Sequence, residues 1–61
     1  MNIEEIIKKR IDKHNKDIKL CQETIRENPS PAKARQMVDL MSDSKSRIFE
    51  LEELMRIIEN Q

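Results

Sequence analysis

Both prolines of this 61-residue chain lie in one short stretch, Asn28-Pro29-Ser30-Pro31, and the chain contains no glycine. Pro29 disfavours the right-handed α conformation at Asn28 and has no N–H for a helical hydrogen bond. Ser30 is a good N-cap, and Pro31 suits the first position of a helix, where an N–H has no intrahelical partner. The stretch therefore predicts a helix that ends, a short turn, and a second helix that begins.

The residues before the turn have the pattern of one long helix. Asn2 is a candidate N-cap, and Glu5 follows three residues later, as in a capping box. Largely apolar residues then recur at alternating spacings of four and three, which is a heptad pattern: Ile7, Ile11, His14, Ile18, Cys21 and Ile25. We expect helix 1 over about residues 3–27, with the turn at 28–30.

The residues after the turn repeat this pattern. The stripe consists of Met37, Met41, Ser44, Ile48, Leu51, Met55 and Ile58, and Ala34 extends it toward the turn. We expect helix 2 over about residues 31–59. Each stripe has one polar member, His14 in the first and Ser44 in the second.

A short connection makes the two helices antiparallel neighbours. Folding the chain at the turn places Ile18 opposite Met41 and Ile11 opposite Ile48, and it brings His14 and Ser44 to the same height. Two independent irregularities that fall opposite each other support the hairpin. Charge agrees with this alignment, because a basic run in helix 1 faces an acidic part of helix 2 that contains Glu50, Glu52 and Glu53. The predicted fold is all-α: an antiparallel, coiled-coil-like two-helix hairpin forming a single domain.

A chain of this size rarely builds a sufficient core alone. Cys21 is the only cysteine, which excludes an internal disulfide and a zinc finger. We therefore expect a homodimer that forms a four-helix bundle. The apolar surface is wider than one stripe, as a bundle requires, and the expected oligomer or partner face consists of Ile3, Ile6, Leu40, Phe49, Leu54 and Ile57.

Enzyme chemistry has little support in this sequence. Without glycine there is no phosphate-binding loop, and no Cys–His pair has local nucleophile spacing. His14 and Cys21 are two helical turns apart, too far for one chain to bring both to one metal ion. We expect no catalytic residue, cofactor or resident metal. The His14–Ser44 layer is expected to fix the alignment of the helices, with a pH-sensitive switch at His14 as the alternative.

Nucleic acid is the weaker binding hypothesis. The 12 basic and 12 acidic residues cancel, so no net charge favours phosphates or an anionic membrane. A basic stripe of Lys9, Lys13 and Lys16 is the candidate contact, although no aromatic residue is available there to stack on bases.

The sequence favours a small non-enzymatic regulator, adaptor or inhibitor that acts by protein–protein interaction through an apolar helical face, as a homodimer. The alternatives are an RNA-binding four-helix-bundle dimer and a purely structural assembly protein. No run of apolar residues exceeds two, so we expect a cytoplasmic protein without a membrane span.

Overall fold

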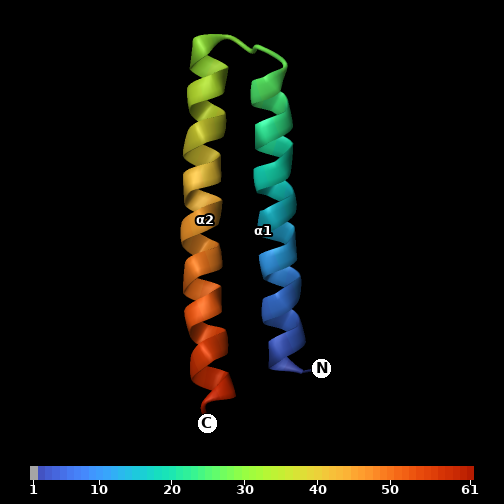
Figure 1. Ribbon diagram of the computed structural model, residues 1–61, viewed down its shortest axis with the longest axis vertical. Helices are drawn as coiled ribbons and strands as arrows, with labels where there is room; N and C mark the ends of the chain where they lie inside the picture. Colours follow the sequence, from blue (N-terminus) through green and yellow to red (C-terminus); the bar gives the residue numbers. More distant parts are fainter. Residues whose placement is uncertain (1) are drawn as a thin grey trace.

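The computed structural model describes residues 2–61 and consists of two α-helices joined by a short turn (Figure 1). Helix α1 spans Ile3–Arg26 and helix α2 spans Pro31–Glu59. The helices run antiparallel and side by side, so both chain ends lie at the end opposite the turn, here called the open end (Figure 1). The described residues contain no strand. The predicted all-α fold with two mutually packed helices is confirmed.

Both helices begin at a capping side chain. Asn2 Oδ1 accepts a hydrogen bond from the backbone N–H of Glu4 at 2.9 Å, and Ser30 Oγ accepts one from the N–H of Lys33 at 3.3 Å. Each bond satisfies a donor that has no partner within its helix. Pro31 is the first residue of α2, where its fixed φ suits the helix.

The turn differs from the expectation in one respect. Helix α1 ends at Arg26, and Asn28 has a φ of 57°, in the left-handed region. The N–H of Asn28 donates to the carbonyl of Ile25 at 3.2 Å. A left-handed residue just after a helix is usually glycine and sometimes asparagine. In a chain without glycine, Asn28 takes this conformation, whereas Pro29 alone predicted only a departure from the right-handed helix.

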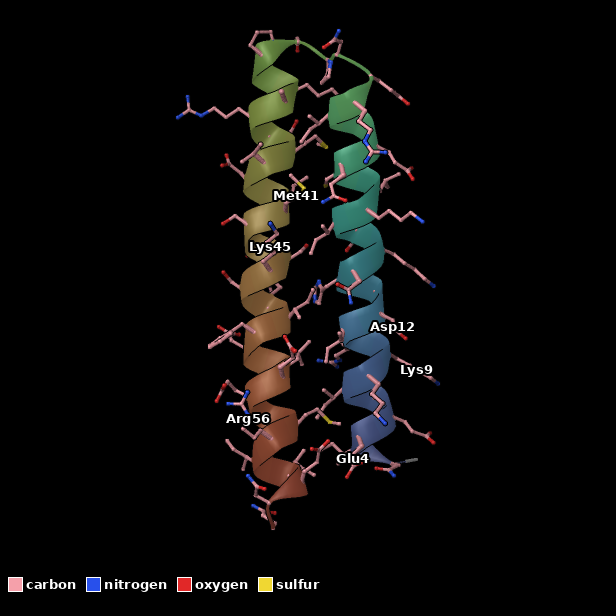
Figure 2. The ribbon with its side chains drawn as sticks, viewed as in Figure 1. Glu4, Lys9, Asp12, Met41, Lys45 and Arg56 are labelled. Carbon is pink, nitrogen blue, oxygen red and sulfur yellow. The ribbon has the colours of Figure 1, made fainter. Side chains whose placement is uncertain are left out.

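The core is one line of side chains between the helices. Ile7 and Cys21 of α1 and Met55 of α2 are its buried apolar residues, and Ser44 is its buried polar residue. Met41 points from α2 toward α1 (Figure 2). The other residues of the two predicted stripes are half-buried: Ile11, His14, Ile18, Ile25, Met37, Met41, Ile48, Leu51 and Ile58. All thirteen stripe residues are thus at least partly buried by the neighbouring helix.

The ion pairs do not follow the expected charge alignment. Arg47 pairs with Asp43 at 3.0 Å and Arg56 with Glu53 at 2.7 Å, and both pairs lie within α2. Across residues 2–61 no ion pair joins the two helices. Exposed pairs contribute little stability, so the apolar line between the helices determines their alignment.

We predict that Asn28→Val lowers the free energy of unfolding by about 1–2 kcal/mol, because a β-branched side chain disfavours positive φ. The matched variant Asn28→Gly should retain or slightly raise stability. Urea unfolding followed by circular dichroism at one fixed protein concentration measures both. Equal stability of the two variants would show that the left-handed conformation at Asn28 is not what ends α1.

Candidate interaction surface

Seven large apolar side chains are exposed on the hairpin: Ile3, Leu20, Val38, Leu40, Phe49, Leu54 and Ile57. Five of them lie on one side, to which both helices contribute. Leu20 and Leu40 line one hollow on this side, and Leu54 lines a second. Residues seven apart share one side of a helix. Ile3 therefore lies in line with Arg10 and Ile57 in line with Glu50, both of which line the second hollow.

We call this side the grooved face. Its first hollow has a volume of about 340 Å³ and lies toward the turn, and its second has a volume of about 270 Å³ and lies toward the open end. His14 lines both hollows and therefore stands between them. Ile6 is half-buried and lies two heptads before Leu20 on the same side of α1. The grooved face thus has an apolar patch toward each end.

Phe49 lies elsewhere. It lines a third hollow with Val38, Ser42 and Lys45, all from α2, and no residue of α1 borders it. Phe49 precedes Leu54 by five residues, which separates the two by about 140° around the helix. The expected oligomer or partner face is therefore divided in this structure. Five of its members lie on the grooved face, and Phe49 lies with Val38 on a separate patch, here called the Phe49 patch.

The two polar members of the stripes, His14 and Ser44, lie near each other between the helices. His14 and Ser44 line the same hollow, and Ser44 is only 8% exposed. The Nδ1 atom of His14 is buried and makes no hydrogen bond, so it does not bond the Ser44 hydroxyl. A buried polar atom without a partner lowers stability. His14 and Ser44 therefore lie at one height between the helices, and the unbonded Nδ1 of His14 lowers the free energy of unfolding.

A charged belt separates the two apolar patches of the grooved face. Its basic members are Arg10, Lys13 and Arg47, and its acidic members are Asp17, Asp43 and Glu50. Arg47 donates a hydrogen bond from Nε to Asp43. This bond and the charge of Asp43, with a smaller contribution from Glu50, raise the pKa of Arg47 above its ordinary value. The belt carries equal numbers of positive and negative groups.

The predicted basic stripe is exposed. Lys9, Lys13 and Lys16 are all on the surface of α1, and Lys9 points away from α2 (Figure 2). Lys9 and Lys16 are seven residues apart on the outer side of the helix, whereas Lys13 lies in line with Leu20 toward the grooved face. Only Lys9 and Lys16 thus share the outer side of α1, whereas Lys13 lies nearer the charged belt.

Neither a metal-binding cluster nor a membrane-crossing helix occurs in residues 2–61. Residues 2–61 contain no cluster of three or more His, Cys, Asp or Glu side chains suited to a metal ion. Neither α1 nor α2 combines the length and the apolar character that crossing a membrane requires. Cys21 is a free thiol that is buried beside the first hollow.

The predicted face omitted one prominent residue. Leu20 is 63% exposed and lies opposite Leu40, where the two residues form the patch nearer the turn. Its interval of fourteen residues from Ile6 was the signal that placed both on one side of α1. Val38, beside Phe49, was likewise left out.

Compared with protein-family models, curated proteins and solved structures, the chain matches none.

We predict that His14→Leu raises the free energy of unfolding by about 1 kcal/mol, because it removes the unpaired buried Nδ1 and adds apolar contacts. The control Asn15→Leu places the same side chain on the adjacent exposed position and should give no such gain. Urea unfolding at one fixed protein concentration compares them. A less stable His14→Leu variant would show that His14 has a stabilising partner.

Proposed function

We propose that the protein is a small non-enzymatic regulator, adaptor or inhibitor that acts by docking its exposed apolar helix surfaces on other protein chains, as a homodimer. One observation carries the proposal: five of seven exposed large apolar residues lie on the grooved face, and they come from both helices. Grouped apolar residues on a surface mark sites of protein interaction. The single buried thiol of Cys21 suits a reducing, cytoplasmic setting.

The mode of action that fits this surface is steric. An apolar helical face binds when a partner helix packs against it with anchors at heptad spacing. Such anchors supply most of the binding energy, while the surrounding charges determine orientation and association rate. Leu54 is the main candidate anchor on the grooved face, and Phe49 is the candidate on the Phe49 patch.

We predict that Phe49→Ala and Leu54→Ala each raise the dissociation constant of this chain's complex, either with itself or with a partner protein, at least about tenfold. The physical reason is the loss of a side chain that the complex buries. The immobilised chain captures a partner from nuclease-treated lysate of its native host, and the purified partner is then titrated calorimetrically against each variant. Self-association is measured in parallel by light scattering. The control Asp39→Ala changes an exposed polar residue of α2 that lines none of the three hollows. Undiminished self-association and partner affinity in both variants would refute these anchors.

RNA binding is the second candidate function. The exposed, unpaired ammonium groups of Lys9 and Lys16 favour it, because neither residue forms an ion pair within residues 2–61. In a dimer, two such stripes provide two basic lines for phosphates.

If this second function holds, Lys9→Glu combined with Lys16→Glu will abolish RNA binding in a filter-binding assay and leave the oligomeric mass unchanged. Lys45→Glu, on the exposed surface of α2, is the matched control. RNA binding that survives the double substitution contradicts the role of the stripe. A protein that assembles with itself and captures neither RNA nor another protein has a purely structural role.

A further inference from the structure

We propose that the occupant of the grooved face is a second copy of this chain, docked with its long axis antiparallel to the first. The two hairpins then form a four-helix bundle in which α1 packs on the partner's α1 and α2 on the partner's α2. The inference rests on the proposed function, because it names the chain that covers the surface on which that function depends.

The grooved face has a symmetric pattern of side chains. On each helix an apolar, a basic and an apolar residue follow one another at intervals of seven: Ile6, Lys13 and Leu20 on α1, and Leu40, Arg47 and Leu54 on α2. Since Leu20 and Leu40 line the same hollow, the two patterns run at matching heights in opposite directions. Lys13 and Arg47 therefore share the middle height, about seven residues from either apolar patch.

This symmetry is what an antiparallel pairing requires. A two-fold axis across the rod at the height of Arg47 exchanges the two ends of each pattern. Leu40 then meets the partner's Leu54, and Leu20 meets the partner's Ile6. The hollow beside Leu20 receives apolar side chains from the partner's open end, and the hollow beside Leu54 receives those from the partner's turn end.

The charged belt is equally balanced in both orientations. Asp17 and Asp43 line the hollow toward the turn, and Arg10 and Glu50 line the hollow toward the open end. An antiparallel pairing places Asp17 against the partner's Arg10, which is favourable, and Asp43 against the partner's Glu50, which is unfavourable. A parallel pairing places Arg10 against the partner's Glu50, which is favourable, and Asp17 against the partner's Asp43, which is unfavourable. Charge therefore permits the antiparallel orientation without selecting it, and cross-linking distinguishes the two.

The exposed area supports a pairing of this size. One hairpin measures 47 × 17 × 13 Å and exposes 5106 Å². A compact monomer of the same mass exposes about 4,200 Å². The excess of roughly 900 Å² is close to the ~800 Å² that each partner buries in a standard specific interface. The hairpin therefore exposes, beyond a compact monomer of its mass, about as much surface as one partner of a dimer buries.

Disulfide cross-linking tests both the face and the orientation. In a Cys21→Ala background that retains its circular dichroism spectrum, Arg47→Cys alone should form a linked dimer on oxidation, because two copies of this position meet at the axis. The control Ser46→Cys points away from the grooved face and should stay unlinked. Linking that occurs only when Arg47→Cys is mixed with Lys13→Cys would overturn the antiparallel orientation, since a parallel pairing places α2 against the partner's α1.

Sedimentation equilibrium of the unmodified chain tests the occupant. We expect twice the mass of one chain, and we expect Leu40→Glu combined with Leu54→Glu to raise the dimer dissociation constant at least about 100-fold, because it places carboxylates in an apolar contact. Val38→Glu combined with Phe49→Glu changes the Phe49 patch and should leave the dimer intact. A monomeric wild type, or a dimer that only the second variant disrupts, overturns the inference.

These results separate the inference from the proposed function. The antiparallel dimer leaves the Phe49 patch exposed once on each copy, which is where a different protein can dock. A monomer that still binds such a protein overturns the dimer and retains the function. If Arg47→Cys forms a linked dimer but the protein captures no other protein, the dimer inference stands and the proposed regulatory function is wrong.

Discussion

The single line of side chains between α1 and α2 is the interaction on which the rest of this molecule depends. Two helices packed side by side bury one stripe each, and among the described residues no side chain is fully enclosed. The four buried residues are Ile7 and Met55 toward the open end, Ser44 near the middle and Cys21 toward the turn, so they are distributed along the rod. This line sets the relative height of the two helices. It thereby decides which exposed residues of α1 lie beside which residues of α2, and so it creates the grooved face.

Much of this architecture is readable from local chemistry. The capping roles of Asn2 and Ser30, the start of α2 at Pro31 and the heptad stripes all depend on residues close in sequence, so the sequence predicts them well. The left-handed conformation of Asn28 was not predicted, because Pro29 restricts its neighbour without selecting positive φ. The unbonded Nδ1 of His14 depends on how its ring packs between two helices, which no local pattern specifies.

The division of the predicted face has a different origin. The sequence groups Phe49 and Leu54 because both are apolar residues outside the stripe, although the helical rotation between them places them on different sides of α2. Following that rotation along both stripes recovers Leu20 and separates Phe49. What the rotation alone does not give is which side of α1 adjoins which side of α2. The hollows supply that information, because each hollow of the grooved face is lined by residues from both helices.

The polar residues between and beside the helices reduce stability, but they restrict the heights at which the helices can pack against each other. A slip of one heptad along an all-apolar line would keep apolar residues in contact, but here it places His14 or Ser44 against an apolar side chain. Lys13 and Arg47 have a similar effect on the grooved face, where they lie between the two apolar patches. Apolar residues at those two positions would merge the patches of the grooved face into one long stripe, which many helices could cover at many heights. Charges at the centre leave two separate patches at a fixed distance, and only a surface with the same spacing satisfies both. The chain's own grooved face has that spacing, and this is the physical reason to regard it as its own partner.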